Sequence, residues 1–224
     1  MFRFLVRSFA GLSGFLALAA LVACNSASAT VIPSPVVDDP LATTRGQQTA
    51  VLAGGCFWGI QAVFEHVKGV ISVTAGYSGG TANTAHYETV SAGTTGHAES
   101  VKIIYDPPQV SFGQILKVFF SVAHDPTQLN RQGPDTGSQY RSVIFFSTER
   151  QLRIAQAYMD QLNEAKVYPR PIVTQVIRLK DFYPAEAYHQ DYLVHHPNNP
   201  YIVINDLPKV AHLREQFPDL YVKK

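Results

Sequence analysis

Cysteine and tryptophan are scarce in this 224-residue sequence, which contains two cysteines and one tryptophan. Cys24 lies near the N-terminus and Cys56 further along, so no network of several disulfides can hold the fold together. Charged residues make up only 16% of the chain and the formal net charge is +1, which gives no electrostatic argument for nucleic-acid binding. The sequence also has no run of lysine or arginine and no internal repeat.

The rest of the composition is that of a globular protein. Hydrophobic residues make up 46% of the sequence, which is typical of a chain that buries a core. A chain of 224 residues has room for one domain with a sizeable core. We therefore expect a single folded domain.

Residues 1–23 have the pattern of a secretory signal peptide. Arg3 and Arg7 form a basic start, and residues 9–23 are apolar except for Ser13. The apolar stretch is too short, and too closely followed by small polar residues, to indicate a membrane span. We therefore expect an exported protein.

Two cleavage sites compete after this leader. Ala27-Ser28-Ala29 fits an ordinary signal peptidase, whereas Leu21-Val22-Ala23-Cys24 resembles the bacterial lipoprotein motif, in which Cys24 is lipidated. We favour the lipoprotein. The exported protein is thus expected to be either a membrane-anchored lipoprotein of a bacterial cell envelope or periplasmic. In the alternative, Cys24 is an incidental residue of a signal that is cut later. A lipid anchor holds a protein at a membrane through its buried acyl chains.

Residues 24–48 are expected to be a flexible tether. Their later part is rich in proline, threonine, serine and aspartate and shows no apolar period. The folded domain is expected to span residues 49–224.

The most informative stretch is Gly54-Gly55-Cys56-Phe57-Trp58-Gly59. A strand-like run, 49–53, leads into it, and a run with helical spacing of apolar residues leads out. We expect Cys56 to lie at the start of that helix, where free N–H groups and the helix dipole favour a thiolate, with its sulfur uncovered. In the alternative reading, Cys56 is a small buried thiol and its aromatic neighbours are core.

Further along, strand-like and helix-like segments alternate without a strict period. Strands are expected at 69–75, 100–105, 140–146 and 171–179, with an apolar segment at 201–204. Helices are expected after the N-cap residue Ser111 and at 149–165, 185–195 and 208–217. The pattern predicts a single α/β (α+β) domain with a mixed sheet and packed helices.

Four polar residues stand at loop or strand ends, where a core does not need them. They are Tyr87, Glu99, Asp135 and Tyr140. Each also has an ordinary structural reading. Glu99 at a strand start would be a solvated carboxylate, the tyrosines half-buried packing residues, and Asp135 a turn residue. Glu186 is expected to be a charge in the first turn of a helix.

Six motifs occur in a fixed order: Gly-Cys-Phe-Trp-Gly, Gly-Tyr-Ser-Gly-Gly, Thr-Gly-His-Ala-Glu, His-Asp-Pro-Thr, Gly-Ser-Gln-Tyr-Arg-Ser and Ala-Glu-Ala-Tyr-His-Gln. In this combination the chain resembles the A type of peptide methionine sulfoxide reductase, from about residue 49 to about 217. The resemblance implies a two-layer, ferredoxin-like core and reduction of methionine S-sulfoxide, free or in peptides. It also implies site roles for Cys56, Glu99, Tyr87, Asp135, Tyr140, Phe57 and Trp58.

The chemistry explains why such residue types are needed. Oxide is a poor leaving group, so reduction of a sulfoxide by a thiol needs a thiolate, a proton for the oxygen and a pocket for the S-methyl group. Cys56 can supply the thiolate, and Glu99 can supply the proton if an apolar surround raises its pKa. The tyrosine hydroxyls can bind the sulfoxide oxygen, and Phe57 and Trp58 can enclose the methyl group.

The sequence departs from many members of the family in lacking a resolving cysteine. No cysteine follows Cys56 down to Lys224. After one turnover Cys56 should therefore be a sulfenic acid, which an external thiol must reduce. Thioredoxin-like, glutaredoxin-like and small thiols all qualify. We expect no bound cofactor and a monomer.

The eight histidines do not indicate a metal site. His195 and His196 are adjacent and point in different directions on a helix, and no zinc-binding motif accompanies the others. His189 is expected to make a polar contact near the site.

Two other functions compete with the reductase. A cysteine hydrolase or acyltransferase would pair Cys56 with His97, His124 or His189. A non-catalytic lipoprotein would bind a peptide or another ligand through Phe57 and Trp58.

Overall fold

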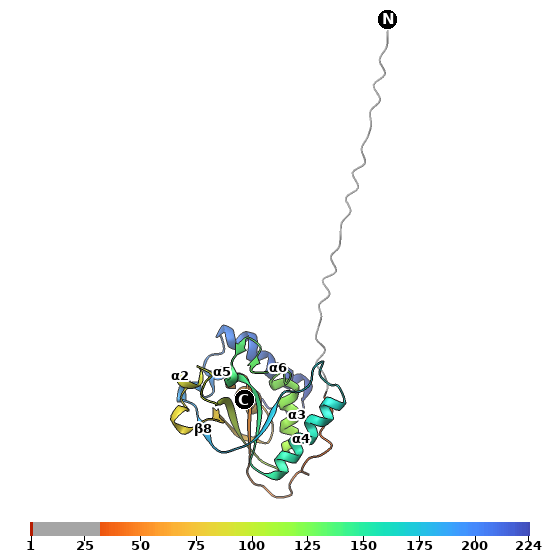
Figure 1. Cartoon of the computed structure of the whole chain (residues 1–224). Coiled ribbons are helices and arrows are strands. Elements are labelled where there is room, and N and C mark those ends of the chain that lie inside the picture. Colours follow the sequence, from red (N-terminus) through yellow and green to blue (C-terminus); the bar gives the residue numbers. More distant parts are fainter. Residues whose placement is uncertain (2–31) are drawn as a thin grey trace.

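The computed structural model describes Met1 and residues 32–224 (Figure 1). Cys24 and, apart from Met1, the predicted signal peptide lie outside the described residues. The main sheet has six strands in the order β7-β6-β1-β3-β2-β8. The strands are β1 (Gln48–Gly54), β2 (Val70–Ser78), β3 (Ala98–Tyr105), β6 (Ser142–Phe146), β7 (Gln175–Arg178) and β8 (Phe182–Pro184). β6 and β7 pair in parallel and the other neighbours are antiparallel, so the sheet is mixed as predicted.

The helices pack around this sheet. The α-helices are α1 (Phe57–Glu65), α2 (Tyr87–Val90), α3 (Phe112–Val118), α4 (Glu149–Glu164), α5 (Tyr192–His195) and α6 (Leu207–Gln216). Two π-helical turns, η2 (Phe119–Ala123) and η5 (Ile202–Asp206), lie at the end of α3 and before α6. Short 3₁₀ turns are η1 (Ala82–Thr84), η3 (Ser138–Tyr140) and η4 (Ala187–His189). The hairpin of β4 (Arg131–Gln132) and β5 (Asp135–Thr136) lies outside the main sheet.

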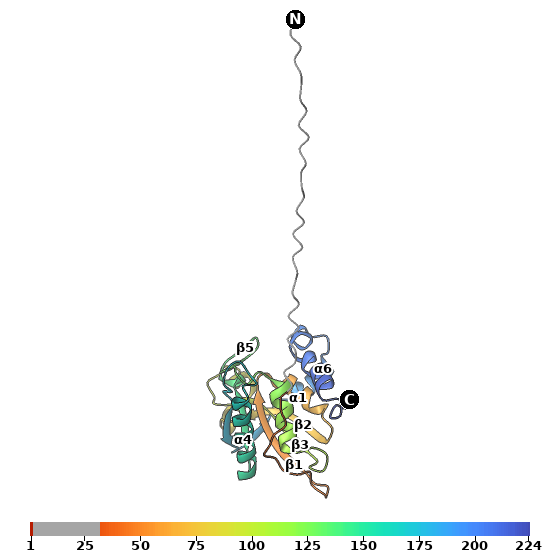
Figure 2. The ribbon, with the colours of Figure 1, turned by 90° about the vertical axis from the view of Figure 1, so that its right-hand side faces the viewer.

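The core lies between the sheet and the helices. Along β1, Ala50 and Leu52 belong to the large cluster that includes residues of α1, α3 and α4. Val51 and Ala53 point to the opposite face and form a small cluster that Phe182 helps to cover. Such alternation follows from the two-residue period of a strand. Figure 2 shows α1 close to β1, β2 and β3, with α6 near it and α4 at the other side.

Local signals in the sequence account for the starts of α3 and α4. Ser111 is the N-cap of α3, as predicted, and the structure adds a capping box with Gln114. The Thr148 hydroxyl caps α4 by accepting from the backbone N–H of Gln151. These caps fix where both helices begin.

The helix expected at 185–195 is broken in two. η4 ends at His189 and α5 begins at Tyr192. Between them the Gln190 side chain bonds the backbone of Ala75 through both its oxygen, at 2.9 Å, and its nitrogen, at 3.0 Å. Asp191 adopts a φ of 52°, which is incompatible with a continuous right-handed helix. Long-range hydrogen bonding to β2 therefore overrides the helical pattern.

The segment expected to be a flexible tether is part of the folded unit over residues 32–47. Ile32 is only 2% exposed. The Pro33 carbonyl accepts a hydrogen bond of 2.7 Å from the Tyr158 hydroxyl. The Asp38 carboxylate accepts from the backbone N–H of Gly113 at 2.9 Å and from the Ser111 hydroxyl, at the start of α3. Because apolar and capping contacts hold this segment, the folded unit begins before residue 49.

We expect Asp38→Ala to destabilise the protein by about 1–2 kcal/mol, the usual effect of removing a helix-capping acceptor. The free energy of unfolding in urea measures this. Asp39→Ala is the matched control, because Asp39 makes a half-exposed ion pair with Arg150, and such pairs contribute ~0–1 kcal/mol. Equal effects of the two substitutions would contradict the assigned role of Asp38.

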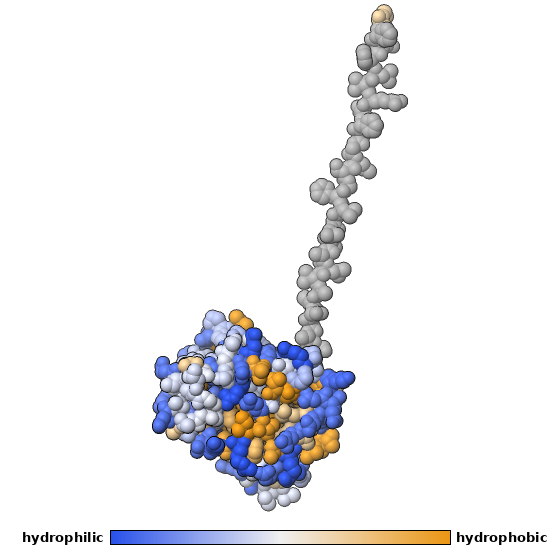
Figure 3. All heavy atoms as spheres, viewed as in Figure 1, coloured by the Kyte–Doolittle hydropathy of each residue, from blue (hydrophilic) through white to orange (hydrophobic). Residues whose placement is uncertain are grey.

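The surface of the domain carries hydrophobic as well as hydrophilic residues. On the face shown in Figure 3, hydrophobic residues gather in the middle of the domain and hydrophilic residues surround them. Apolar atoms normally make up more than half of a folded protein's surface, so this alone does not define a binding site. Within the described ranges, no helix combines the length and the apolar character needed to cross a membrane.

Candidate active site

Cys56 lies at the turn from β1 into α1, as the sequence predicted. It is the N-cap residue of α1, and β1 ends two residues before it at Gly54. Gly55 has a φ of +102°, and a Cβ there would lie 2.6 Å from Cβ of Gln132. Only glycine fits this turn. The expectation that the sulfur of Cys56 is uncovered is wrong, because Cys56 is only 8% exposed.

The surroundings of the sulfur raise, rather than lower, the pKa of the Cys56 thiol. Burial raises it well above its ordinary value, and the Glu99 and Asp206 carboxylates raise it further. The backbone N–H of Trp58 and the Lys209 ammonium act in the opposite direction. The expectation that the helix start alone would favour the thiolate therefore fails, because desolvation outweighs the N–H groups.

Glu99 is a buried carboxyl group beside the start of α1. It is 2% exposed and lies at the second position of β3. Its Oε2 accepts a hydrogen bond of 3.1 Å from the backbone N–H of Phe57, the residue after Cys56. Burial raises the pKa of Glu99 to about 8, despite that hydrogen bond. The alternative of a solvated carboxylate is excluded by this burial.

Cys56 and Glu99 therefore form a coupled pair. Each raises the energy of the other's anion, since a negative charge on Glu99 raises the pKa of Cys56. Two such groups lose their protons in two steps that belong to the pair. After the first step, the pair carries one negative charge and one proton. One of its two forms is a thiolate beside a carboxylic acid.

Tyr87 and Tyr140 flank this pair. Tyr87 begins α2 and Tyr140 ends η3. Burial raises the pKa of both phenols, and the Glu99 carboxylate raises it further. Both hydroxyls therefore stay protonated at neutral pH and can act as hydrogen-bond donors.

Glu186 is not the charge in the first turn of a helix that the sequence suggested, because its carboxylate is hydrogen-bonded to two tyrosines. One carboxylate oxygen accepts from the Tyr77 hydroxyl and the other from the backbone N–H of Tyr87, both at 2.9 Å. These contacts fix the first residue of α2. Glu186 thus orients Tyr87 without being a member of the candidate site itself.

Phe57 and Trp58 form an aromatic wall with residues from the C-terminal part of the chain. The Trp58 indole N–H donates to Nδ1 of His189 at 3.1 Å, which is the polar contact expected of that histidine. Trp58 also stacks on Tyr192, with ring centroids 3.7 Å apart and planes at 6°. The wall is therefore held rigidly. Tyr192 has no sequence signal that marks it for this position.

Asp135 lies in β5 and is joined to the site by a tyrosine that the sequence analysis missed. Its Oδ2 accepts a hydrogen bond from the Tyr201 hydroxyl. Both residues line a cavity of about 180 Å³ together with Cys56 and Lys209. Asp135 is therefore more than a turn residue. Tyr201 had been noted only as the start of an apolar segment, and no local motif connects it with Cys56.

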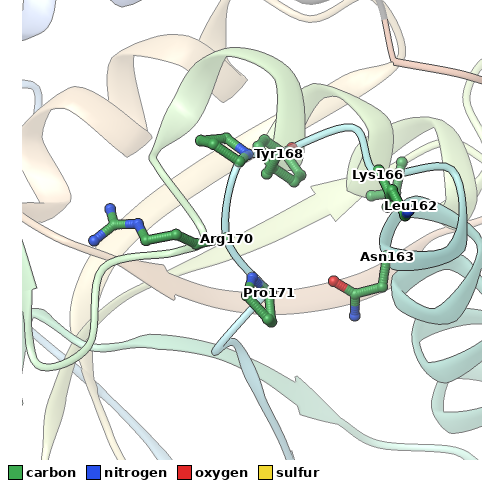
Figure 4. Close-up of a pocket in the computed structure, with 7 residues that line it drawn as sticks. Leu162, Asn163, Lys166, Tyr168, Arg170 and Pro171 are labelled. Carbon is green, nitrogen blue, oxygen red and sulfur yellow. The ribbon is translucent and has the colours of Figure 1, made fainter.

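A larger hollow, about 630 Å³, lies at the C-terminal end of α4 (Figure 4). Leu162, Asn163 and Lys166 belong to this end of α4 and the turn after it, and Tyr168 and Arg170 follow. None of the site residues expected from the sequence lines this hollow. The candidate site therefore lies at the smaller cavity beside Cys56.

The histidines that a hydrolase would need are engaged away from Cys56. His124 Nε2 bonds the Ser142 hydroxyl at 2.7 Å, and burial lowers the pKa of His124 to about 4. Both ring nitrogens of His97 bond the backbone of the loop at 80–81. His189 accepts from the indole described above. No Cys–His pair is formed, so the hydrolase is not favoured.

The described residues also contain no group of three or more histidine, cysteine, aspartate or glutamate side chains that could hold a metal ion. Cys56 is the free cysteine of this part of the chain.

Gly59, the last residue of the Gly-Cys-Phe-Trp-Gly motif, packs directly against a buried ion pair. A methyl group at Gly59 would collide with Oδ1 of Asp206 and would lie 2.8 Å from Nζ of Lys209. We expect Gly59→Ala to destabilise the protein by about 1–3 kcal/mol, as overpacking does. Gly46→Ala is the control in urea unfolding, because a Cβ at Gly46 meets only Cγ of Pro107, at 3.9 Å. A Gly59→Ala variant as stable as that control would contradict this packing.

The mixed α+β domain carries a buried cysteine and a buried acid at the start of a helix, and comparison with known proteins identifies it as an oxidoreductase. The family model for peptide methionine sulfoxide reductase matches residues 48–221. The chain belongs to this family, and it is a peptide-methionine (S)-S-oxide reductase that reduces methionine sulfoxide.

Individual relatives agree with this assignment. MsrA 2 of Mesorhizobium japonicum is 62% identical over 179 residues, covering 80% of this chain and 92% of that protein. MsrA 2 of Synechocystis sp. is 56% identical over 191 residues, covering 84% and 89%. Methionine sulfoxide reductase A of Corynebacterium diphtheriae has a similar structure, with a TM-score of 0.59 and 34% identity over 75% of this chain and 85% of that one.

Proposed function

We propose that Cys56 attacks the sulfoxide sulfur as a thiolate while Glu99 protonates the oxygen. The attack forms a bond between the two sulfur atoms. The protonated oxygen then passes from the substrate sulfur to the Cys56 sulfur as the substrate S–O bond and the S–S bond break, so that methionine leaves and Cys56 becomes a sulfenic acid. The substrate sulfur is thereby reduced by two electrons and the cysteine sulfur oxidised by two. The observation that supports this most directly is the buried Glu99 carboxyl, bonded at 3.1 Å to the N–H of the residue after Cys56.

The surrounding side chains would stabilise this reaction. Tyr87 and Tyr140 would donate hydrogen bonds to the oxygen as it gains charge. Phe57 and Trp58 would enclose the S-methyl group of the substrate. Asp135 would act through Tyr201, because its carboxylate accepts a hydrogen bond from the Tyr201 hydroxyl.

The cycle would then be closed by an external thiol. Because no cysteine follows Cys56 in the sequence, a second internal thiol cannot come from the C-terminal part of the chain. One external thiol would displace water from the sulfenic acid and form a mixed disulfide with Cys56. A second would release a free Cys56 thiol and an external disulfide. A thioredoxin-like protein, a glutaredoxin-like protein and a small thiol are all compatible with these steps.

The rate of the reductase step should depend on pH as a bell-shaped curve. It rises as the Cys56–Glu99 pair loses its first proton and falls as it loses the second, because Glu99 must keep a proton to donate. Since the pKa of Glu99 is raised to about 8, the acid form is present below that pH, and the falling limb should lie above it. Single-turnover rates measured across pH test this. A rate that rises with pH and shows no falling limb at any pH at which the protein stays folded would remove the need for a protonated Glu99.

The N-terminal part of the chain would place this activity outside the cytoplasm. We propose that residues 1–23 direct export, that Cys24 is lipidated, and that the enzyme works as a monomer in a bacterial cell envelope. The intact mass of the protein recovered from membranes distinguishes a lipidated Cys24 from a chain that begins at Thr30.

Dimedone, which reacts with sulfenic acids, tests the proposed intermediate. After incubation with a methionine sulfoxide peptide and no reductant, Cys56 should carry one dimedone group. The same protein incubated with the methionine peptide should carry none. Formation of methionine without label at Cys56 would contradict the sulfenic acid intermediate.

A further inference from the structure

An ion pair from the C-terminal part of the chain lies beside Cys56, and the mechanism proposed above uses neither of its residues. Asp206, at the end of η5, is 0% exposed. Its Oδ1 accepts a hydrogen bond of 3.0 Å from Nζ of Lys209. The Lys209 side chain is 19% exposed, and it lines the cavity that also contains Cys56.

The pair is seated on the helix that Cys56 begins. Gly59 lies in the first turn of α1, and the space where its side chain would be is filled by Oδ1 of Asp206 and Nζ of Lys209. The second carboxylate oxygen of Asp206, Oδ2, is buried and has no hydrogen-bond partner in the described part of the chain. Asp206 is thus a buried carboxylate with a single cation as its partner.

Stability alone is a weak reason for such an arrangement. A buried ion pair contributes little to stability, because the desolvation of both charges offsets their attraction. Burial of a carboxylate is still less favourable when one of its oxygens has no hydrogen-bond partner, because that oxygen gives up its hydrogen bonds to water and gains none in the protein. Placing the pair beside a reactive sulfur gives it a second effect, because its two charges act on the thiolate in opposite directions.

We propose that Asp206 and Lys209 are positioning residues of the reductase reaction, in which the Lys209 ammonium stabilises the Cys56 thiolate and Asp206 holds that ammonium in place while limiting its effect. The proposal rests on Cys56 being the attacking group of the proposed function. It concerns the population of the thiolate before substrate binds.

Several other ionisable groups surround the sulfur and must be considered with the pair. They are Glu99 from β3, Asp135 from β5, and the phenols of Tyr87, Tyr140 and Tyr201. All of these are neutral or acidic. Asp206 raises the pKa of Cys56 and Lys209 lowers it. Lys209 is the cation of this group among the described residues, so it is the side chain that can favour an anion at the sulfur.

The test uses two variants and the pH dependence of Cys56 alkylation. Asp206→Asn keeps the shape of the side chain and the oxygen that Lys209 donates to, but it removes the negative charge. Asp206→Asn/Lys209→Met then removes the positive charge in the absence of a buried carboxylate. Iodoacetamide reacts with the thiolate, and peptide mass locates the reaction at Cys56, so Cys24 does not contribute.

We expect opposite effects from the two steps. Asp206→Asn should lower the apparent pKa of Cys56 by about one unit, which is about a tenfold faster alkylation at a pH below that pKa. The added Lys209→Met change should reverse this gain. A pair that only supports packing would not move the apparent pKa in opposite directions. An unchanged pKa in Asp206→Asn, or equal values in the two variants, would overturn the proposal.

Two controls separate folding and catalysis from this result. Urea unfolding shows whether each variant is folded, and Asp206→Ser makes the same charge change if the asparagine variant is not. Single-turnover methionine formation is measured on the unsubstituted protein in parallel. Absence of methionine there would refute the proposed function, whereas the alkylation profiles would still decide the effect of the pair on the thiol.

Discussion

Replacing Cys56 by serine is expected to abolish reduction of methionine sulfoxide, with a loss of about 10⁴-fold or more in the rate of methionine formation. A serine hydroxyl stays protonated in this site and cannot attack the sulfoxide sulfur. It also cannot hold the oxygen as a sulfenic acid. Methionine formation from a methionine sulfoxide peptide with excess dithiothreitol measures the loss.

The fold should survive this substitution, since the Cys56 side chain makes no disulfide in the described structure and serine is similar in size. Cys24→Ser is the matched control and should keep full activity, because the family match begins after residue 24. Activity of the Cys56→Ser variant near that of the control would mean that another group attacks the substrate.

Glu99→Gln should slow the reductase step by about 10²–10⁴-fold, the usual contribution of a general acid. The amide of glutamine is isosteric with the carboxyl group and can still accept the hydrogen bond from the N–H of Phe57, so the fold should be retained. It cannot supply the proton that the departing oxygen needs. Single-turnover methionine formation isolates this step from the reduction of Cys56.

Glu88→Gln is the control, because Glu88 is an exposed carboxylate in the first turn of α2. The Glu99→Gln variant should also lose the falling limb of the pH profile. In addition, Cys56 should be alkylated more readily, since a neutral amide does not repel the thiolate. A normal single-turnover rate with a lowered apparent pKa for Cys56 would show that Glu99 affects the thiol but is not the acid.

Local patterns were enough to predict where Cys56 and Glu99 of the candidate site lie in the fold. The glycines before Cys56 and the helical spacing after it placed the thiol at a strand–helix turn, and the structure has it there. Glu99 was expected at the start of a strand, and it is the second residue of β3. Such predictions succeed because turn geometry and apolar periodicity depend on neighbouring residues.

The second half of the site comes from contacts that no local pattern contains. Tyr201 and Lys209 lie more than a hundred residues after Cys56, yet they share its cavity. The raised pKa of the Cys56 thiol has the same origin, because burial and the charges of Glu99 and Asp206 depend on packing. The packing of Ile32 and Asp38 was missed because a polar, proline-containing segment can also be held by a few specific contacts.

The most direct test of the account is a single turnover without reductant, followed by peptide mass analysis, on the protein and its Cys24→Ser variant. One methionine per enzyme, with one added oxygen at Cys56 in both, is the predicted result. It would establish Cys56 as the nucleophile and an external thiol as the reductant. Methionine formed with no oxygen at Cys56, or with a disulfide to Cys24, would contradict the proposed cycle.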